Sequence, residues 1–368
     1  MQIKYNKILR NSYSILNPNQ VGYLIFYVTN RCNFRCNFCF YNAEIEKGLK
    51  PDEMTVKEIN KMAPTIGPLV QLSLTGGETF LRKEFSEIAG ILIDATDVRW
   101  VTIPTNASLT NKMVSFLEEI LPRFSSTYFR LTFSIEGIGE THDNLRSMPG
   151  SFEKIKKSYA AISPLRRKYS NLVLDCNSVF TASSENYLLN TLKVINKDFK
   201  FDNMSVTYAR GKIKDKNLKI VSEGRYKEIN QFLERREKGK EKRLLYPLWR
   251  GVNSVSRDNL MKTVFDDKFV SACVAGRKLL VISETGNVQP CEILGKSFGN
   301  LRDYDWDLNK LLKNSKVKET RKWIRDSKCK CSFECALAAN VVWNKKNYPK
   351  VLLSAIKNIG KEELKLKE

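Results

Sequence analysis

Short runs of β-branched and aromatic residues alternate along most of the chain with longer segments in which apolar residues recur at helical spacing. Repeated units of a strand followed by a helix typically build a parallel sheet that is covered by helices. The pattern therefore predicts an α/β fold, a partial (β/α)6 TIM-like barrel that is left open on one side. Its strands are expected near residues 22–28, 70–75, 99–105, 128–135, 172–180 and 203–209.

Helices are expected between the strands, at 55–63, 85–95, 111–120 and 152–162. Thr55 is a suitable N-cap for the first of them, and Glu58 three residues later completes a capping box. In the second helix, the apolar residues fall on one stripe of the surface. We interpret these stripes as parts of the barrel core that carry no chemistry.

Beyond Arg210 and Gly211, the composition shifts to a dense mixture of charges with an excess of Lys and Arg, which predicts a solvated connecting helix. A second cysteine-rich segment follows, and the chain ends in lysines alternating with apolar residues. We therefore expect a lead segment at 1–20, the barrel at 21–215, a charged helical connector at 216–270, a small cysteine-rich domain at 271–345 and a basic amphipathic tail at 346–368.

Composition restricts the class of protein. Of the 368 residues, 42% are hydrophobic and 28% are charged, which is typical of a globular protein with a sizeable core. No apolar run approaches the roughly 18 residues of a membrane span, and the first residues lack the apolar stretch of a signal peptide. We therefore expect a cytoplasmic protein. Eight of the nine cysteines lie in two groups with short spacings, which in a reducing compartment favours metal over disulfides.

The formal net charge of +22 has two interpretations. It indicates an anionic partner, such as a nucleic acid, an acidic peptide or a phospholipid surface. It also fits a lysine-rich composition with no specific partner, and the sequence alone leaves both open.

The stretch CNFRCNFCF places three thiols, Cys32, Cys36 and Cys39, in one tight loop after the first predicted strand. Three thiolates can bind three irons of a [4Fe–4S] cube and leave the fourth iron without a protein ligand. An iron with a free position can hold a substrate or a cofactor, as an open zinc site holds water. A structural zinc site or a disulfide pair is the alternative.

With Phe38 before its third cysteine, this loop resembles the signature of the radical S-adenosylmethionine (SAM) superfamily. The resemblance implies that SAM chelates the open iron, and that one electron cleaves SAM to a 5′-deoxyadenosyl radical that takes a hydrogen atom from the substrate. It also implies a flavodoxin- or ferredoxin-type reductant.

Later turns extend the resemblance. Glycines in LTGGETF let backbone approach a ligand closely, and PTNA is similar to the family's TNG turn, with Ala107 in place of glycine. The segment SIEG…THDNLR resembles the family's SLDG…HDxxR, where Arg146 would bind the SAM carboxylate by two hydrogen bonds. For His142 we favour a structural hydrogen bond over catalysis. The implied SAM-binding residues are Phe38, Gly76, Gly77, Glu78, Asn106, Ser134, Glu136, Arg146 and Tyr208.

Cys176 stands alone beside Asp175 in the fifth predicted strand, so only one of the two side chains can face the barrel lumen. A lumen-facing Cys176 is a candidate catalytic residue, because it could donate a hydrogen atom to a substrate radical. A free cysteine is nonetheless commonly a small buried hydrophobe, and we favour that interpretation.

The second cysteine set begins with Cys273 and Cys291, joined by a predicted hairpin with its turn at 285–287, and ends with CKCSFEC. It resembles the SPASM/twitch extension of the radical SAM superfamily, which binds auxiliary iron–sulfur clusters. We expect one auxiliary [4Fe–4S] cluster; a zinc ribbon is the alternative. Its expected ligands are Cys273, Cys291, Cys335 and one of Cys329 or Cys331, with Cys331 favoured.

The sequence thus predicts a radical SAM enzyme with oxidative chemistry, and its expected substrate is a peptide or protein side chain, for which an acidic peptide would suit the charge. No leader-binding domain is expected, because only residues 1–20 precede the barrel. Oxidation or coupling of a small molecule or a membrane lipid is the alternative. The apolar residues Val351, Leu352, Ile356 and Ile359 lie among lysines of the tail, which could rest on an anionic membrane. An iron–sulfur scaffold or a nucleic-acid-binding protein is less favoured, because neither needs a SAM site.

Overall fold

The computed structural model describes residues 17–18, 20–48, 52–237 and 246–363, with side chains of the last helix described as far as Ile356. Most of the predicted lead segment, and Ile359 with the end of the predicted tail, therefore lie outside the described side chains. No helix in these ranges is long and apolar enough to cross a bilayer.

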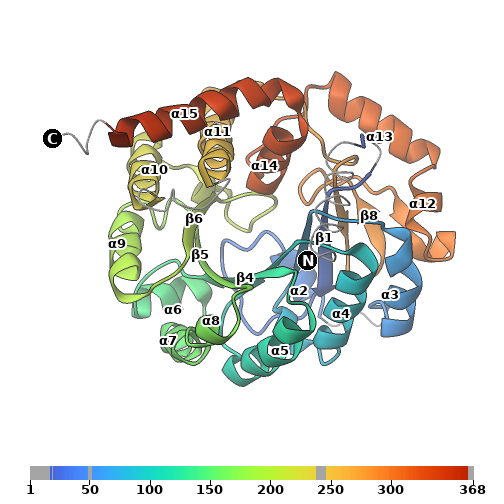
Figure 1. Ribbon diagram of the computed structural model, residues 1–368, viewed down its shortest axis with the longest axis horizontal. Coiled ribbons are helices and arrows are strands. Elements are labelled where there is room, and N and C mark those ends of the chain that lie inside the picture. The colour runs from blue at the N-terminus through green and yellow to red at the C-terminus, as the bar shows by residue number, and fades with distance from the viewer. Residues whose placement is uncertain (1–16, 19, 49–51, 238–245, 364–368) are drawn as a thin grey trace.

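Six parallel strands form the centre of the molecule in the order in which they occur along the chain. All six strands predicted from the sequence are present, and helices surround them on the outside (Figure 1). This confirms the partial (β/α)6 barrel. The strands are β1 (Tyr23–Thr29), β2 (Gln71–Gly76), β3 (Trp100–Thr105), β4 (Tyr128–Ser134), β5 (Leu172–Phe180) and β6 (Asn203–Tyr208).

The predicted helices are also present, and Thr55 caps α3 through the expected capping box with Glu58. The predicted connector holds two helices, α10 and α11. The helices are α2 (Asn42–Glu46), α3 (Val56–Met62), α4 (Phe85–Thr96), α5 (Thr110–Arg123), α6 (Glu140–Arg146), α7 (Ser151–Ile162), α8 (Leu165–Lys168), α9 (Leu188–Asp198), α10 (Glu223–Glu237), α11 (Tyr246–Val264), α12 (Leu308–Leu311), α13 (Ser315–Asp326), α14 (Glu334–Trp343) and α15 (Tyr348–Glu363).

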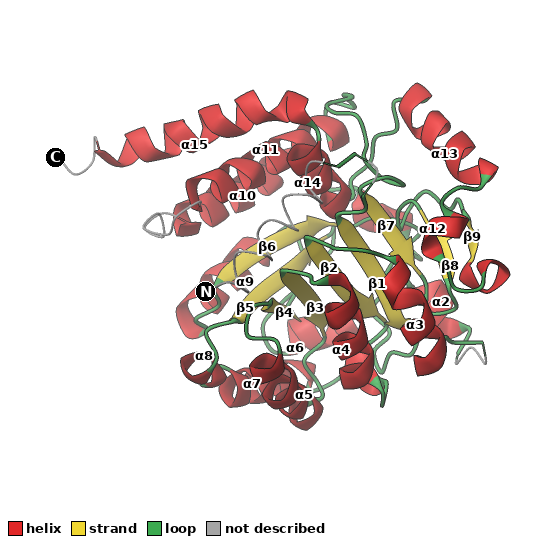
Figure 2. Ribbon diagram, turned by 45° about the vertical axis from the view of Figure 1, so that its right-hand side comes forward, coloured by secondary structure: helices red, strands yellow, loops and turns green. Residues whose placement is uncertain are grey.

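The C-terminal strands continue the same sheet. β7 (Leu279–Ile282) pairs in parallel with β1, and β8 (Asn287–Gln289) and β9 (Gly299–Asn300) follow antiparallel (Figure 2). The hairpin expected around 285–287 is therefore confirmed. Its attachment to β1 was not foreseen, and it brings the second cysteine set to the edge of the barrel that is nearest the first.

The two faces of the sheet differ in polarity. Alternate residues of each strand pack under the helices in one large core that includes Leu24, Phe26 and Val28 of β1. Parallel strands with both faces buried are usually apolar on both. On β1 and β7 the inner face carries buried apolar and aromatic residues such as Ile25 and Val281. On β2 to β6 it is largely polar, so this part of the inner face must meet water or a ligand. Its polar residues are Ser73, Thr75, Thr102, Arg130, Thr132, Ser134, Asp175, Asn177, Asn203, Ser205 and Thr207.

Candidate functional site

The three cysteines of the first set lie in the loop that leaves β1 at its carboxyl end. Cys36 is buried, whereas Cys32 and Cys39 are half-buried, and all three are free thiols. The Phe34 N–H donates to Cys32 Sγ at 3.4 Å, and the Cys39 N–H donates to the Cys36 carbonyl at 3.2 Å. The loop thus already has hydrogen bonds of its own.

The donor set suits an iron–sulfur cluster because it consists of soft thiols in a mainly apolar setting. Burial raises the pKa of Cys32 to about 12 and that of Cys39 to about 11, so both are neutral thiols near neutral pH until a metal displaces their protons. In the described part of the chain, no three His, Cys, Asp or Glu side chains are already gathered as a metal site. The thiols would converge only when the cluster binds.

The turn after β2 rests directly on the start of this loop. The Gly77 N–H donates to the Thr29 carbonyl at 2.9 Å, and the Glu78 N–H donates to the Arg31 carbonyl at 2.7 Å. A Cβ atom on Gly77 would lie 2.0 Å from the Arg31 carbonyl oxygen, and one on Gly76 would lie 2.1 Å from that of Thr29. Only glycine allows this approach.

Glu78 links the ends of β2 and β3. Its carboxylate is almost completely buried and accepts hydrogen bonds from the Thr105 hydroxyl at 2.9 Å and from the Asn106 N–H at 2.8 Å. Burial raises the pKa of Glu78 to about 7, although these hydrogen bonds act in the opposite direction. In this structure the Glu78 carboxylate therefore holds the turn after β3. Its expected contact with the SAM amine would be a second role.

Asn106 reaches from the β3 turn to the cysteine loop. Its side-chain amide donates to Asn33 Oδ1 at 2.8 Å, and its own Oδ1 accepts from the Ser108 N–H at 3.0 Å. The next residue, Ala107, is buried and has φ of 57°, the left-handed conformation that favours the glycine of the family pattern.

Arg146 and Glu136 form a buried ion pair after β4. Arg146 Nε and Nη2 donate to the two carboxylate oxygens of Glu136 at 2.5 and 2.7 Å, and Nη1 lies 3.7 Å from Cys36 Sγ. The guanidinium also lies over the Phe38 ring, 5.4 Å from its centre. Two of its donors, expected to bind the SAM carboxylate, thus hold Glu136 here, and Nη1 faces the cysteine loop.

His142 keeps the structural role favoured by the sequence analysis. Its Nδ1 accepts a hydrogen bond from the Glu136 N–H at 3.2 Å. Burial, with the positive charge of Arg146, lowers the pKa of His142 to about 3, so the ring is neutral. It therefore fixes the loop that carries Glu136.

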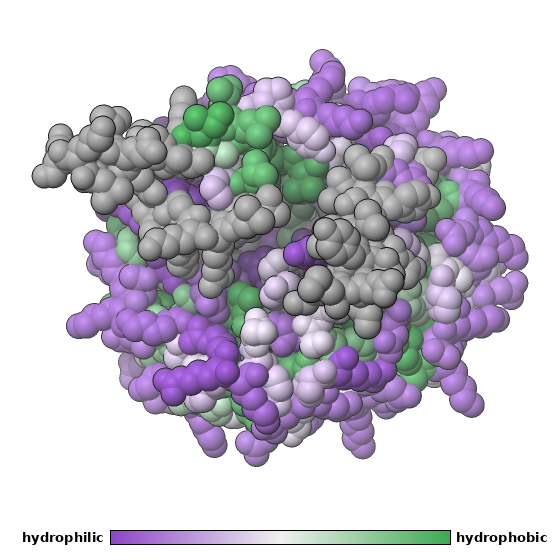
Figure 3. Space-filling model, viewed as in Figure 1, coloured by the Kyte–Doolittle hydropathy of each residue, from purple (hydrophilic) through white to green (hydrophobic). Residues whose placement is uncertain are grey.

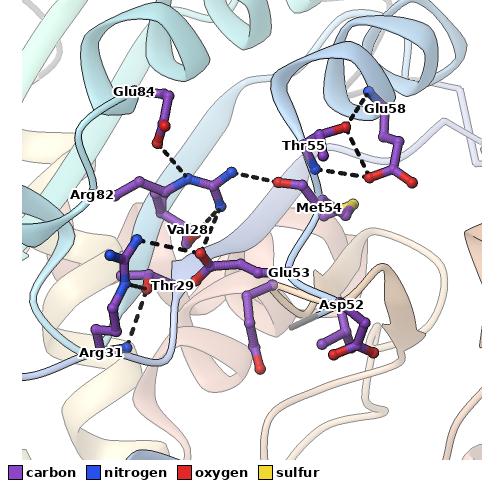
Figure 4. Close-up of polar contacts among 12 residues, drawn as sticks. Val28, Thr29, Arg31, Asp52, Glu53, Met54, Thr55, Glu58, Arg82 and Glu84 are labelled. Carbon is purple, nitrogen blue, oxygen red and sulfur yellow. Dashed lines mark hydrogen bonds and ion pairs between the residues drawn. The ribbon is translucent and has the colours of Figure 1, made fainter. Parts of the chain in front are cut away.

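A set of ion pairs and hydrogen bonds that the sequence analysis missed joins the start of the cysteine loop to neighbouring segments (Figure 4). The buried Arg82 donates to the Val28 carbonyl at 2.6 Å and to the Met54 carbonyl. Glu53 accepts from Arg31 Nη2 at 3.3 Å and lies 3.7 Å from Arg82 Nη1. Arg82 thereby joins the end of β1 to the segment before α3.

Arg210 is mostly buried between the two cysteine regions. Its guanidinium lies 4.8 Å from the ring centres of Phe40 and Phe333. It donates to Glu292 Oε2 at 3.1 Å and lies 3.8 Å from Glu334 Oε2. Phe40 follows Cys39, and the two glutamates adjoin Cys291 and Cys335, so this side chain connects both cysteine sets.

Tyr27 of β1 extends this network. Its hydroxyl donates to Glu292 Oε1 at 2.8 Å, and its ring lies 4.6 Å from that of Tyr41. Burial raises the pKa of Glu334 to about 7, against the opposing effect of Arg210. The only signal for this network in the sequence was the position of each glutamate beside a cysteine.

The second cysteine set gathers around the inner side of β1 and β7. Cys291 belongs to an apolar cluster that Cys273, Cys331 and Cys335 also contact. Burial raises the pKa of all five thiols of this set, that of Cys331 to about 12 and that of Cys335 to about 11. Burial is the main cause of the raised pKa of Cys335, which also lies beside the charges of Arg210 and Glu292.

Two expected site residues point away from the lumen. Cys176 is fully buried in the main core, and Asp175 on the opposite face accepts from Arg130 Nε at 2.7 Å. Tyr208 also packs in that core, edge-on to Phe265 at 6.4 Å. Both side chains thus lie on the outer face of their strands. Cys176 is therefore not placed to donate a hydrogen atom to a substrate in the lumen, and the Tyr208 ring is not placed to stack on adenine. The half-buried Ser134 does face inward, as expected.

Residues 26–175 match the sequence pattern of the radical SAM superfamily. The chain therefore contains a radical SAM domain. GTP 3',8-cyclase from Haemophilus influenzae (strain PittEE) is 30% identical over 141 residues, which cover 36% of this chain and 42% of that protein. The match thus spans less than half the length of this curated relative. AdoMet-dependent heme synthase from Oleidesulfovibrio alaskensis is 23% identical over 289 residues, which cover 75% of this chain and 71% of that protein.

Two solved structures share the fold of this chain. Streptococcus suis SuiB bound to S-adenosylmethionine has a TM-score of 0.58 at 16% identity and covers 82% of this chain and 68% of its own. The protein anSMEcpe with bound AdoMet has a TM-score of 0.57 at 19% identity and covers 93% of this chain and 98% of its own. At these identities the likeness shows the fold.

Proposed function

We propose that the protein is a radical SAM enzyme that holds a [4Fe–4S] cluster on Cys32, Cys36 and Cys39 and binds SAM beside it. The observation that carries this proposal is that the turns after β2, β3 and β4 each contact the cysteine loop, through Gly77, Asn106 and Arg146. A scaffold protein has no need of three separate strand ends on one loop. When bound, the cluster would supply the electron that cleaves SAM to a 5′-deoxyadenosyl radical.

The residues around the loop would bind and orient SAM. Gly76 and Gly77 hold the turn after β2 against the cysteine loop, so that the backbone of this turn would lie close to a ligand amine bound there. Arg146 is positively charged at neutral pH and offers Nη1 toward Cys36, where a carboxylate would be stabilised. Glu136 holds this guanidinium in place through two hydrogen bonds. Arg146 thus both stabilises the thiolates and directs one donor into the site.

The second cysteine set would hold an auxiliary [4Fe–4S] cluster, with Cys273, Cys291 and Cys335 as ligands and either Cys329 or Cys331 as the fourth. The apolar cluster that contains Cys291 is also contacted by Cys273, Cys331 and Cys335, which favours Cys331, and the resemblance to the SPASM/twitch extension supports the same set. A fully ligated cluster can only pass electrons. Such a cluster would accept the electron left on the substrate, which makes the overall reaction an oxidation.

The substrate we propose is a peptide or protein side chain. Two solved neighbours, SuiB and anSMEcpe, are described with a precursor peptide and with a bound peptide. The inner face offers hydroxyl and amide groups that could bind a peptide backbone, such as Asn177, which donates to the Thr207 hydroxyl at 3.2 Å. Arg130, on the same face, is paired with Asp175, so the lumen gives no support for an acidic substrate.

A small-molecule substrate is the second candidate. It is favoured by the heme synthase relative, because that match extends over 75% of this chain. The polar inner face would suit a hydroxyl-rich molecule equally well.

The experiment that tests the proposal uses anaerobically reconstituted protein and a Cys32/Cys36/Cys39→Ala variant. About eight irons per chain are expected in the wild type and about four in the variant, with 5′-deoxyadenosine formed only by the wild type. About four irons together with zinc in the wild type would contradict the auxiliary cluster and indicate that the second cysteine set binds zinc. Single Cys329→Ser and Cys331→Ser variants identify the fourth ligand, because only its loss lowers the iron content.

The substrate class needs a separate assay. Peptides encoded beside the gene are incubated with reduced enzyme and SAM, and mass spectrometry is used to detect the loss of two hydrogen atoms. SAM cleavage with every peptide unchanged would reject the peptide proposal and leave the small-molecule one.

A further inference from the structure

Helix α15 is fixed to the body of the protein by one face only. Val351 is buried in a small apolar cluster with Val255 of α11 and Val341 of α14, and Ala355 one turn later is also buried. In addition, the backbone of Gly251 lies so close that a Cβ there would be 2.6 Å from the Val351 carbonyl oxygen. The helix is therefore firmly packed, and packing does not explain the apolar residues on its other face.

That other face exposes a ridge of aliphatic side chains. Leu352, Leu353 and Ile356 are 52%, 61% and 64% exposed, and their spacing places them side by side on the helix. Tyr348, one turn earlier, is exposed as well. Figure 3 shows apolar side chains gathered along the upper part of the molecule, over α15. Contiguous exposed apolar residues of this kind usually mark an interaction site.

A basic hollow of about 590 Å³ adjoins the start of the same helix, between residues 269–274 and the corner that joins α14 to α15. Its lining has no Asp or Glu but includes four cations, Arg277, Lys345, Lys346 and Lys350. Within the described residues, none of these four forms an ion pair. Lys350 belongs to α15 itself, so the hollow and the ridge form one continuous face.

We propose that this face binds the surface of an anionic phospholipid bilayer. A helix that lies flat, with an aliphatic ridge beside lysines, has the arrangement of interfacial helices, whose apolar residues enter the boundary between headgroups and acyl chains. The cations of the hollow would meet lipid phosphates, and the net charge of +22 would add attraction over a longer range. The binding is peripheral, and it is independent of the chemistry proposed for the barrel.

The test is sedimentation of the full chain with vesicles of phosphatidylglycerol mixed with phosphatidylcholine, and with vesicles of phosphatidylcholine alone. Wild-type protein should sediment with the anionic vesicles and be released by high salt. Leu352→Ser/Leu353→Ser/Ile356→Ser should lower the bound fraction at least about tenfold, because three aliphatic groups no longer leave water. Lys345→Gln/Lys346→Gln/Lys350→Gln should weaken binding to the anionic vesicles by a similar factor.

Matched controls remove the same kinds of groups elsewhere. Val194→Ser/Ile220→Ser/Trp323→Ser takes away three exposed apolar residues, and Lys112→Gln/Lys154→Gln/Lys157→Gln takes away three exposed lysines. Both should bind like the wild type. Equal loss in test and control variants would show that composition, not this face, drives binding.

Two further outcomes would overturn the proposal. One is that the ridge variant still binds the vesicles like the wild type. The other is that the wild type is a dimer by light scattering, fails to bind vesicles and becomes a monomer in the ridge variant. The ridge would then be an interface between two copies of the chain.

Discussion

The two cysteine regions are held in place by different kinds of contact. Around the first, glycines, backbone amides and short polar side chains from turns that follow consecutive strands lie against the cysteine loop, and the ion pairs of Arg82 and Arg146 add to these contacts. Around the second, the main support is a buried ion-pair network in which Arg210 meets Glu292 and Glu334, residues far away in the sequence.

The difference separates two ways of building a site. Backbone contacts at strand ends follow from a local motif, and they tolerate changes of charge but not of volume. A buried ion pair tolerates small shifts of volume, but it fails when one charge is removed. Added volume at the glycines should therefore damage the first region, and removal of the Arg210 charge should damage the second.

The largest effect is expected from Gly77→Ala. The new Cβ would lie 2.0 Å from the Arg31 carbonyl oxygen and 3.0 Å from Cys32 Cβ, so the cysteine loop must shift. We expect loss of 5′-deoxyadenosine formation and of about four irons per chain, with the second cluster retained. Gly224→Ala in α10 is the control, because its Cβ would meet only Ser222 Oγ at 3.6 Å. Retention of both clusters in the Gly77 variant would contradict the comparison.

Arg210→Met tests the ion-pair network of the second region. It leaves Glu292 and Glu334 buried without their counter-charge, which should lower the free energy of unfolding by about 3–5 kcal/mol in urea titrations. Arg210→Lys should recover only part of this, because lysine lacks the planar group that lies between Phe40 and Phe333.

A double-mutant cycle shows whether the effect comes from this network. Arg210→Met combined with Glu292→Gln should be more stable than the sum of the two single changes, since the second removes the unpaired charge. Strict additivity, or an Arg210→Met variant within about 0.5 kcal/mol of the wild type, would mean that the ion pair does not support the second region.

The sequence predicted most of the first region and little of the second. Strand positions, the Thr55 capping box and the requirement for glycine at Gly77 are local properties, and all could be predicted from neighbouring residues. The attachment of β7 to β1 and the partners of Arg210 depend on residues that only the fold brings together.

Strand parity explains why the orientation of Tyr208 was mispredicted and why that of Cys176 was left open with burial favoured. Both lie in strands whose two faces carry residues compatible with burial, so the sequence did not show which face they occupy. The polar inner face, with Asp175 and Thr207 at the alternate positions, decides this only once the register of the strands is known.

Asp143→Asn should lower stability by a smaller amount. It tests how much the hydrogen bonds accepted by this carboxylate stabilise the segment after β4, which carries Arg146 of the first region. Burial alone would raise the pKa of Asp143, but hydrogen bonds from the Phe152 N–H, the Ser151 hydroxyl and the Gly150 N–H lower it overall. The folded pKa thus lies below the unfolded one. The contribution to stability is therefore complete above about pH 5 and is lost as the pH falls through the unfolded and then the folded value.

At pH 7 the variant should lose about 1 kcal/mol, because an amide accepts these hydrogen bonds less strongly than a carboxylate does. The measurement is thermal unfolding followed between pH 3 and pH 7. The melting temperatures of the wild type and the variant should converge towards pH 3. A constant difference between them at every pH would mean that the loss of stability does not come from the charge of Asp143.

The smallest effect is expected from Ala107→Gly, and it has the opposite sign. Ala107 has φ of 57°, a conformation that costs an L-residue about 1–2 kcal/mol and costs glycine little. Against this gain stand the greater chain entropy of glycine and the lost burial of one methyl group, so the net stabilisation should be about 0.5 kcal/mol. Ala107→Val keeps the unfavourable φ and adds volume in a buried turn, so it should be destabilising. If urea titration shows that Ala107→Gly is clearly less stable than the wild type, the methyl group packs more favourably than its backbone is strained, and the turn after β3 depends on side-chain packing as well as on backbone contacts.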